Sequence, residues 1–411
     1  MAPVLSAGTL LAWGRAAGLL GAAGLLVQVG LVARARRLER RFGQERLTRW
    51  HRVLGPAVAL VLLAHPALLL AARAAKTRAP WLDLLSAVWG WEYVPEACAG
   101  LALILAAAAL SLSALRRRLS YEAWKLAHGL IYLGLALSLP HQLTLGRLFQ
   151  DRPAAAALWA IGFAAGALML AASRWLRPLR LAREHGFIVD RVERESEGVV
   201  SVWIAGRRLE AFAAQPGQFL LLSFAAPGLR WPAHPFSLSR PPDGRHLRVS
   251  IKAVGGFTRA AQGLRRGTPV TLDGPLGAFT ARRAPGPRVL LVAGGIGITP
   301  LRALAEEFQS QGKDCVLVYA SRDLPSAVFA GELAALERRG SLKVHHVLSQ
   351  APDWEGEKGH VDAPRLKRLV PDCAEREAFL CGPPAMVDAV RRCLQELGVA
   401  PRRIHYERFE L

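Results

Sequence analysis

The chain has 411 residues, of which 52% are hydrophobic, and its formal net charge at pH 7 is +21. Its five cysteines form no CxxC pair, which argues against an iron–sulfur centre or a zinc site. The basic charge is uneven, because residues 1–183 hold 22 Lys and Arg against 7 Asp and Glu, or about +15 of the total.

Four apolar runs before residue 176 are each long enough to cross a bilayer, and a fifth is interrupted by polar residues. The predicted spans cover residues 8–33, 50–73, 97–115, 122–146 and 154–175. Lys and Arg cluster in the segments after spans one, three and five, and positive charge marks the cytoplasmic side. We therefore expect an integral protein of a bacterial inner or plasma membrane, with its N-terminus outside and its C-terminal half in the cytosol. This topology accounts for the charge without a nucleic-acid partner.

Four of the eleven histidines lie in the predicted spans, His51 and His65 in the second, His128 and His141 in the fourth. Both spans run in the same direction, which places His51 and His128 near the inner surface and the other two nearer the outer one. Fourteen residues of helix return His65 to within about 40° of the face of His51. His141 is thirteen residues after His128, and on an ideal helix its side chain lies well off the face of His128. We therefore expect a kink or π-bulge at Pro140 to redirect the His141 side chain.

Two opposed pairs of imidazoles are what two six-coordinate b-type haems require, since each iron takes one nitrogen from each helix. A single intramembrane histidine has a plainer explanation, a hydrogen bond to a neighbouring helix or an anchor at the membrane interface. Four histidines in matched pairs favour ligation. The predicted iron ligands are His51, His65, His128 and His141.

The C-terminal half changes to short alternating segments with Gly and Pro turns, which predict an antiparallel β-barrel over residues 184–284. Over residues 285–411 strands alternate with helices, a pattern typical of a doubly wound α/β nucleotide domain. The expected fold is thus an α-helical transmembrane bundle over residues 1–180 followed by these two domains.

Two motifs in the β-domain suit a flavin. HPFSLS occupies residues 234–239, where Ser237 is placed to donate a hydrogen bond to a flavin ring nitrogen. IKAVGGFT occupies residues 251–258, where Lys252 and consecutive glycine amides suit a pyrophosphate, with Thr258 as a helix N-cap.

Two further motifs in the α/β domain suit a dinucleotide. VAGGIGITP, at residues 292–300, reads as a strand, a glycine turn and a helix start, where phosphate is favoured. FLCGPPAM, at residues 379–386, sets a second glycine turn beside Cys381 at a strand end. Any one of these turns is explained by turn geometry alone, and Cys381 by itself is explained as a small buried residue. Their order and spacing together are more specific.

Together these features resemble the NADPH oxidase and ferric reductase superfamily, in which a di-haem transmembrane domain is fused to a ferredoxin–NADP reductase-type module. The resemblance covers nearly the whole chain and implies that the four transmembrane histidines hold haem. The residues that match its FAD-binding motifs are His234, Pro235, Phe236, Ser237, Ser239, Lys252, Gly255, Gly256, Phe257 and Thr258. Those that match its nicotinamide dinucleotide motifs are Gly294, Gly295, Gly297, Thr299, Pro300, Cys381, Gly382 and Pro383.

The resemblance implies three more assignments. Phe409 fits the C-terminal aromatic that covers the flavin ring in relatives. Ser321 and Arg322 match the segment that meets the adenosine ribose, where Arg322 would favour NADPH; an arginine after a strand is also commonly only solvated. Arg15 matches an arginine that pairs with an outer-haem propionate, and snorkelling to the outer surface explains it equally. The predicted catalytic residues are Phe409, Cys381 and Ser237.

The predicted function is electron transfer across the membrane. NADPH or NADH passes a hydride to FAD in the cytosol, and the flavin releases single electrons to the inner and then the outer haem. We expect oxygen as the outer acceptor, giving superoxide, with a ferric chelate as the alternative; Arg73, Lys76 and Arg78 would attract its negative charge. Two other interpretations stay open, an electron donor to an extracytoplasmic protein and a haem-free reductase tethered to the membrane.

Overall fold

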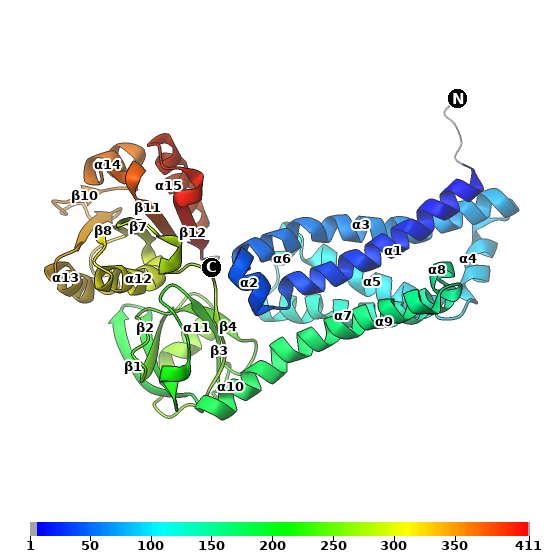
Figure 1. Cartoon of the computed structure of the whole chain (residues 1–411), viewed down its shortest axis with the longest axis horizontal. Coiled ribbons are helices and arrows are strands. Elements are labelled where there is room, and N and C mark those ends of the chain that lie inside the picture. Colours follow the sequence, from blue (N-terminus) through cyan, green and yellow to red (C-terminus); the bar gives the residue numbers. More distant parts are fainter. Residues whose placement is uncertain (1–5, 410–411) are drawn as a thin grey trace. The chain divides into compact units, whose positions relative to one another are not determined.

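The computed structural model describes residues 6–409 and divides into two compact units (Figure 1). Unit 1 comprises Met1–Arg36 and Arg46–Arg174, and unit 2 comprises Arg37–Glu45 and Trp175–Leu411. Most of the short helix α2 (Arg36–Phe42) belongs to unit 2, where the Gly277 amide donates a hydrogen bond of 2.8 Å to the Glu39 carboxylate.

Unit 1 is helical, and its long helices run alongside one another (Figure 1). They follow the order of the five predicted spans: α1 (Ala7–Val32), α3 (Gln44–Thr77), α5 (Val94–Leu110), α7 (Tyr121–Leu145) and α9 (Pro153–Ala171). Short helices lie between them: α4 (Trp81–Trp89), α6 (Ser113–Arg116) and α8 (Arg147–Gln150).

Fewer than five of these helices are apolar enough to cross a membrane by length and hydropathy. Three helical segments of the described chain meet that test: Ala7–Val32, Arg46–Thr77 and Pro153–His185. The pair α4 and α5, bent by 105° between them, makes a fourth if it forms one span. Helix α7, which is mostly apolar but carries Glu122, Lys125 and two histidines, is not among them. Unit 1 therefore supplies the apolar helices of an integral membrane protein, with a span count that is only approximately the predicted five.

Glycines allow two helix pairs of unit 1 to approach closely. A Cβ atom added to Gly18 of α1 would lie 2.7 Å from the His65 ring on α3. Gly100 of α5 faces Gly134 of α7. A Cβ on Gly100 would lie 2.6 Å from the Gly134 carbonyl oxygen, and a Cβ on Gly134 would lie 2.7 Å from the Gly100 carbonyl oxygen. Small residues at such crossings are typical of helices packed in a membrane, where close backbone contact drives association.

The predicted π-bulge at Pro140 is wrong, because α7 is an unbroken α-helix from Tyr121 to Leu145. Side-chain hydrogen bonds support the turn around the proline, from Gln142 Nε2 to the Ser138 carbonyl (2.9 Å) and from Thr144 Oγ1 to the Pro140 carbonyl (3.1 Å). The described chain instead has a π-helical turn at Ala172–Leu176, which joins α9 to α10 (Arg177–His185).

The first part of unit 2 consists of two three-stranded antiparallel sheets. One has the order β1 (Ile188–Ser196), β2 (Val199–Ala205), β5 (His246–Lys252), and the other β4 (His234–Ser237), β3 (Phe219–Phe224), β6 (Val270–Leu276). Isolated bridges pair Ile188 with Pro269 and Leu238 with Val249 across the two sheets. The antiparallel pairing is as predicted. The strands form two sheets linked by these bridges, where the sequence predicted one barrel.

The second part of unit 2 is a six-stranded sheet whose paired strands are all parallel. Its order is β10 (Glu357–Lys358), β9 (Leu342–Leu348), β8 (Asp314–Ser321), β7 (Arg288–Gly294), β11 (Glu377–Gly382), β12 (Ile404–Arg408). Its helices are α12 (Ile298–Ser310), α13 (Ala330–Arg338), α14 (Ala363–Leu369) and α15 (Pro384–Glu396).

This sheet has an apolar core on each face, as a doubly wound fold requires. Along β7, Leu291 packs into one core, whereas Leu290 and Val292 pack into the other. The strand order runs outward in both directions from the neighbours β7 and β11. The crevice at the carboxyl ends of these two strands is the place where such sheets bind ligands.

Candidate functional site

Unit 1 holds two pairs of facing imidazole rings. The ring centroids of His51 and His128 are 6.0 Å apart, and those of His65 and His141 are 6.4 Å apart. Two iron–nitrogen bonds of about 2 Å plus the half-widths of two rings come to about 6 Å, so an iron between opposed imidazoles needs this spacing. The structure therefore brings the four predicted histidines together in the predicted pairs, and their spacing fits iron.

The hydrogen bonds of two rings fix which nitrogen is available to a metal. His65 Nδ1 lies 2.8 Å from the Gly14 carbonyl oxygen, which only accepts, so Nδ1 carries the proton and Nε2 keeps its lone pair. His128 Nδ1 lies 2.9 Å from Ser111 Oγ, and that hydroxyl donates to the Ala107 carbonyl at 2.8 Å. The serine oxygen thus accepts from His128, whose Nε2 is likewise available. Metal-binding histidines are commonly held in this way through the second ring nitrogen.

The ring of His128 is also held from one side by an indole. Trp124 stacks on it with centroids 5.3 Å apart and an interplanar angle of 24°. Trp124 Nε1 donates to Ser111 Oγ at 3.2 Å, and the Arg116 guanidinium lies 4.7 Å from the indole ring centre. The serine hydroxyl therefore links the backbone of α5 to two side chains of α7.

The other ring of each pair has an unpaired nitrogen. Within residues 6–409, no hydrogen-bond partner reaches the buried Nδ1 atom of His51 or that of His141. Buried polar atoms are rarely left unpaired, so these nitrogens point to a ligand. In the same part of the chain, no group of three or more His, Cys, Asp or Glu could hold a metal ion. A porphyrin supplies four of the six ligands itself, so paired histidines suit haem better than a bare ion.

Arg15 lies on α1 next to Gly14, whose carbonyl oxygen bonds to His65. Its side chain is exposed. Arg15 therefore follows a residue that contacts His65, and its pairing with a haem propionate stays a prediction; its exposure is what snorkelling predicts.

In unit 2, the flavin motif forms β4 and meets the glycine-rich motif. His234 stacks on Phe257 with centroids 4.1 Å apart and an angle of 29°, and Phe236 lies 6.1 Å from the same ring. Two motifs separated by some twenty residues are thus in contact. In the remainder of HPFSLS, Pro235 is exposed, whereas Ser237 and Ser239 are buried.

The phosphate-binding stretch begins at Lys252, the last residue of β5, and leads into the short helix α11 (Gly256–Ala260). Gly255, not Thr258, occupies the N-cap position, so that detail of the sequence prediction is wrong. The Thr258 hydroxyl instead accepts from the Gly255 amide at 2.8 Å, because its position three residues into the helix lets it reach back. A Cβ on Gly256 would meet nothing within 4 Å, which leaves room beside the backbone.

The two dinucleotide turns lie against each other at the carboxyl ends of β7 and β11. A Cβ on Gly297 would lie 2.3 Å from the Cys381 carbonyl oxygen, and one on Gly382 would lie 3.1 Å from Gly294 Cα. Gly295, between them, has a positive φ of 52°. Glycine is therefore required here for close backbone approach, as expected of a dinucleotide crevice.

The residues that flank these turns are mostly buried. Cys381 is fully buried, as its alternative explanation as a packing residue predicts, and Pro383 precedes α15 as its N-cap. Thr299 and Pro300 are buried in the first turn of α12, where Thr299 Oγ1 donates to the Ile296 carbonyl at 3.0 Å.

Phe409 lies beside the second turn, since its amide donates a hydrogen bond of 3.0 Å to the Gly382 carbonyl. Its half-buried ring packs against the apolar core of the α/β sheet. Ser321 is the last residue of β8, and Arg322 follows it; the serine hydroxyl donates to the Asp323 carbonyl at 3.1 Å, and the arginine is exposed. The structure thus joins Phe409 to the C-G-P turn and leaves Arg322 open to solvent.

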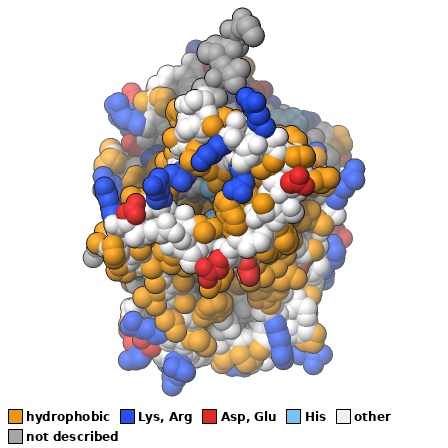
Figure 2. Space-filling model, turned by 90° about the vertical axis from the view of Figure 1, so that its right-hand side faces the viewer, with side chains coloured by type: hydrophobic (Ala, Val, Ile, Leu, Met, Phe, Trp, Pro, Cys, Tyr) orange, Lys and Arg blue, Asp and Glu red, His pale blue; other side chains and the backbone are white. Residues whose placement is uncertain are grey.

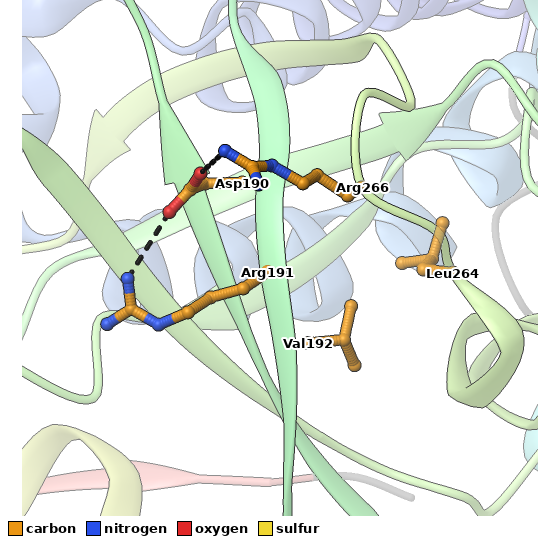
Figure 3. Close-up of a pocket in the computed structure, with 5 residues that line it drawn as sticks. All are labelled: Asp190, Arg191, Val192, Leu264 and Arg266. Carbon is orange, nitrogen blue, oxygen red and sulfur yellow. Dashed lines mark hydrogen bonds and ion pairs between the residues drawn. The ribbon is translucent and has the colours of Figure 1, made fainter.

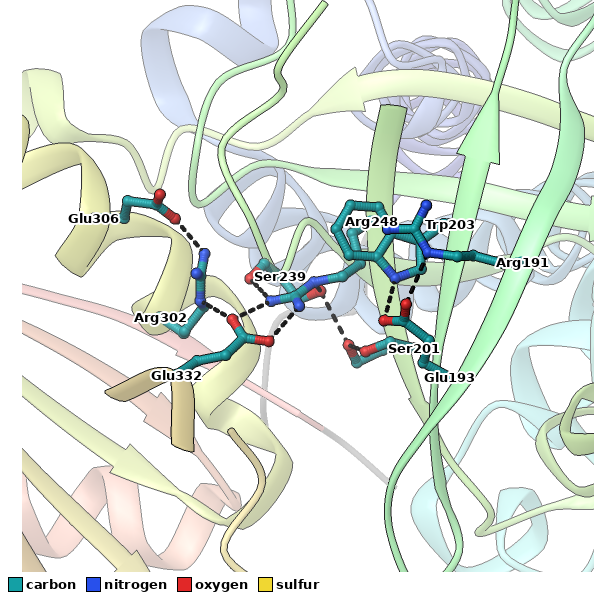
Figure 4. A network of polar contacts seen from close by, with 10 residues as sticks. Arg191, Glu193, Ser201, Trp203, Ser239, Arg248, Arg302, Glu306 and Glu332 are labelled. Carbon is teal, nitrogen blue, oxygen red and sulfur yellow. Dashed lines mark hydrogen bonds and ion pairs between the residues drawn. The ribbon is translucent and has the colours of Figure 1, made fainter. Parts of the chain in front are cut away.

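A buried polar network in unit 2 escaped the sequence analysis (Figure 4). It joins Ser239 to Arg248 on β5, Glu332 on α13 and Arg302 on α12. The available signal was one arginine, Arg248, in the middle of the apolar strand segment HLRVSIK. Ser111 and Trp124 were missed as well, because no motif surrounds them.

A surface pocket of about 410 Å³ lies away from the predicted residues. It is lined by Asp190, Arg191, Val192, Leu264 and Arg266 (Figure 3). The Asp190 carboxylate is paired with two arginines that line the same pocket. Arg191 Nη1 lies 3.2 Å from it and Arg266 Nη2 lies 3.5 Å from it.

Three family models match successive parts of the chain. Residues 17–139 match "Ferric reductase like transmembrane component", residues 191–278 match "FAD-binding domain", and residues 291–392 match "Oxidoreductase NAD-binding domain". The four histidine positions fall within or just beyond the first match, which ends two residues before His141.

Curated relatives match about half of the chain. The chain is 30% identical to the "Glycine betaine monooxygenase reductase subunit" of Pseudomonas aeruginosa (strain UCBPP-PA14), over 48% of this chain and 57% of that protein. It is also 30% identical to an "NADPH oxidoreductase" of Mycobacterium tuberculosis, over 56% of this chain and 62% of that protein. The chain thus spans about three fifths of the length of these relatives.

One solved structure aligns over 97% of both chains, flavohemoglobin from Malassezia yamatoensis with bound FAD and heme, at 19% identity and a TM-score of 0.51. At this identity the likeness is one of fold. The family matches identify an oxidoreductase that binds FAD and NAD(P) beside a membrane domain. With these three modules in this order, the chain has the architecture of the NADPH oxidase and ferric reductase superfamily.

Proposed function

We propose that this protein moves electrons from cytosolic NADPH, through FAD and two b-type haems, to oxygen on the far side of the membrane, giving superoxide. The observation that carries the proposal is the pair of imidazole–imidazole separations, 6.0 and 6.4 Å, at four histidines of α3 and α7. In this proposal residues 1–180 form the di-haem domain, residues 184–284 the FAD domain and residues 285–411 the NAD(P) domain. The N-terminus lies outside and the two nucleotide domains lie in the cytosol.

When bound, FAD takes a hydride from the nicotinamide, and the haems pass on single electrons. The chain's own residues hold these groups in place. Gly297 and Gly382 keep side chains out of the crevice, so that a dinucleotide can approach the backbone. Ser237, buried at the end of β4, would donate a hydrogen bond to the flavin ring, and Cys381 and Phe409, at the second glycine turn, would border the nicotinamide.

In the membrane domain, each proposed iron has one ligand with a fixed tautomer. Ser111 would hold His128 in the orientation that binds an inner iron, and the Gly14 carbonyl would hold His65 in the orientation that binds an outer one. A donated hydrogen bond from Nδ1 makes the imidazole a stronger ligand through Nε2. His51 and His141 would supply the second ligand of each iron, and Arg15 would pair with an outer-haem propionate.

A ferric chelate is the alternative acceptor. Figure 2 shows Lys and Arg side chains around the face of the molecule that bears the end of unit 1. Lys76 and Arg78 are exposed, and the half-buried Arg73 lies 5.1 Å from the centre of the Trp91 ring. Such cations favour an anionic acceptor. A third candidate, an extracytoplasmic electron-accepting protein, would use the same route.

The acceptor is tested by stopped-flow reduction of the purified protein with NADPH, with and without oxygen. Haem oxidation by oxygen alone, with superoxide detected, is the expected result. Haem that is oxidised only after a ferric chelate is added would overturn the oxidase assignment in favour of the reductase. Haem that oxygen and chelate both leave reduced would favour a protein acceptor.

A further inference from the structure

Arg248 is a buried arginine whose guanidinium contacts two different parts of unit 2. It is 3% exposed in the middle of β5. Its Nε donates to Ser239 Oγ at 3.1 Å, and its Nη2 donates to the Ser239 carbonyl at 2.9 Å. The same guanidinium binds both carboxylate oxygens of Glu332, at 2.5 and 3.0 Å (Figure 4). Bidentate pairs of this kind fix orientation as well as distance.

Glu332 is shared between two arginines. It stands in the first turn of α13, and its Oε2 lies 2.7 Å from Nε of Arg302, a residue of α12 that is 5% exposed. Burial on its own raises the pKa of Glu332, but the hydrogen bond from Arg248 and the positive charges of Arg302 and Arg248 outweigh it and lower that pKa. The carboxylate therefore stays ionised and bridges two guanidinium groups at neutral pH.

The ends of this bridge belong to the two halves of the proposed hydride-transfer site. Ser239 closes the flavin motif HPFSLS within the FAD-binding match, and Arg302 follows the dinucleotide turn by two residues, in the NAD-binding match. On the flavin side the network continues into the sheet, where Ser250 Oγ lies 2.9 Å from Ser239 Oγ. A continuous series of polar contacts thus connects the flavin motif HPFSLS to helix α12, which follows the dinucleotide-binding glycine turn.

A buried ion pair is weak evidence for stability, because desolvation of the charges offsets much of their attraction. A better-supported role of a buried ion pair is to favour one relative orientation of the packed elements over the alternatives. Hydride transfer needs that selection, since a displacement of about 1 Å between the reacting groups lowers the rate by about a hundredfold.

We infer that Glu332 is a positioning residue, which locks the nucleotide-binding domain to the flavin-binding domain in the orientation that hydride transfer requires. The inference rests on the proposed transfer of a hydride from NADPH to FAD.

The test is stopped-flow flavin reduction by NADPH in full-length Glu332→Gln, with and without deuterium on the transferred position. The amide keeps the size of the side chain but removes the negative charge that pairs with the buried Arg248. Arg302 loses one of its two carboxylate partners and keeps the other, Glu306. We expect FAD content to be unchanged, flavin reduction to slow by about tenfold or more, and the deuterium isotope effect to rise. Glu306→Gln is the matched control, because Glu306 pairs with the same Arg302 at 2.5 Å but within α12, and so does not link the two domains.

Flavin reduction at the wild-type rate in Glu332→Gln would overturn the inference, as would an equal loss in Glu306→Gln. A rate that falls only because FAD is lost would also count against it. If Glu332→Gln does not fold, Glu332→Asp is measured instead; it keeps the charge on a shorter side chain, so an intermediate rate is expected and a wild-type rate contradicts the inference. Failure of the wild-type protein to reduce its flavin with NADPH would refute the proposed function itself.

Discussion

Ser111 Oγ lies 2.9 Å from Nδ1 of His128 and donates its own proton elsewhere, to the Ala107 carbonyl. This serine therefore acts as the acceptor that fixes the tautomer of one proposed iron ligand. The corresponding acceptor for His65 is a backbone carbonyl, that of Gly14, which no side-chain substitution removes. The two proposed haems thus differ in the group that orients one of their ligands, a serine hydroxyl in one and a backbone carbonyl in the other. Only at the His128 haem can a side-chain substitution remove that group.

Ser111→Ala removes that acceptor and leaves the Nδ1 proton of His128 without its partner. A less strongly donating imidazole stabilises ferric iron less, so the midpoint potential of one haem should rise while the other stays constant. Potentiometric titration followed in the visible spectrum measures both. Ser173→Ala, which removes a hydroxyl that donates to the Leu170 carbonyl at 3.2 Å, is the control. Two unchanged potentials, or two that shift together, would contradict the assigned role.

Gly18→Ala tests the crowding around the second histidine pair. The new methyl group would lie 2.7 Å from Nδ1 of His65, so the ring must move and the Gly14 hydrogen bond must lengthen. We expect partial loss of one haem per chain, measured as haem content against protein. Gly30→Ala on the same helix is the control, because a Cβ there meets nothing within 4 Å. Full haem content in Gly18→Ala would show that this contact does not position a ligand.

Gly297→Ala tests the dinucleotide crevice. Its Cβ would lie 2.3 Å from the Cys381 carbonyl oxygen, a backbone atom that cannot swing away. The two turns must separate, so the KM for NADPH should rise at least about tenfold and stability should fall by about 1–3 kcal/mol. Steady-state kinetics and thermal unfolding check both. Gly286→Ala, with open space around its Cβ, should match the wild type, and a Gly297→Ala enzyme that does so as well would remove this crevice from the binding site.

Cys315 predicts how stability depends on alkaline pH. Burial raises the pKa of its thiol from 9.0 to about 12. The unfolded chain then loses this proton at lower pH than the folded protein, so stability is full below pH 9 and falls between about pH 9 and 12. The free energy of unfolding, measured with urea at several pH values, should decline less steeply in this window in Cys315→Ala. Cys393→Ala is the control for a half-buried thiol, and equal slopes in Cys315→Ala and wild type would contradict the prediction.

Local patterns predicted the parts of this molecule that depend on neighbours along the chain. Strand–helix alternation gave the doubly wound sheet, and the glycines at 294, 297 and 382 marked turns that the structure places in contact. Helical repeat and span direction likewise paired His51 with His128 and His65 with His141. Their role as iron ligands stays a prediction.

Features that depend on distant contacts were not predictable in this way. Arg248 and Glu332 are 84 residues apart, and no periodicity relates a strand residue to the first turn of a later helix. The unbroken helix at Pro140 was not predictable either, because the propensity of proline favours a break, whereas α7 continues through it in the packed bundle. Whether strands close into one barrel is also decided by pairing across sheets, which alternation within a strand does not encode.

Haem content per chain is the most direct measure of the central claim that four histidines of α3 and α7 hold two irons. A pyridine haemochrome assay on purified full-length protein should give two b-type haems per chain, and His65→Ala should give one, while His360→Ala on the surface of unit 2 should keep both. Fewer than two haems in the wild type, or two haems retained in His65→Ala, would contradict the account.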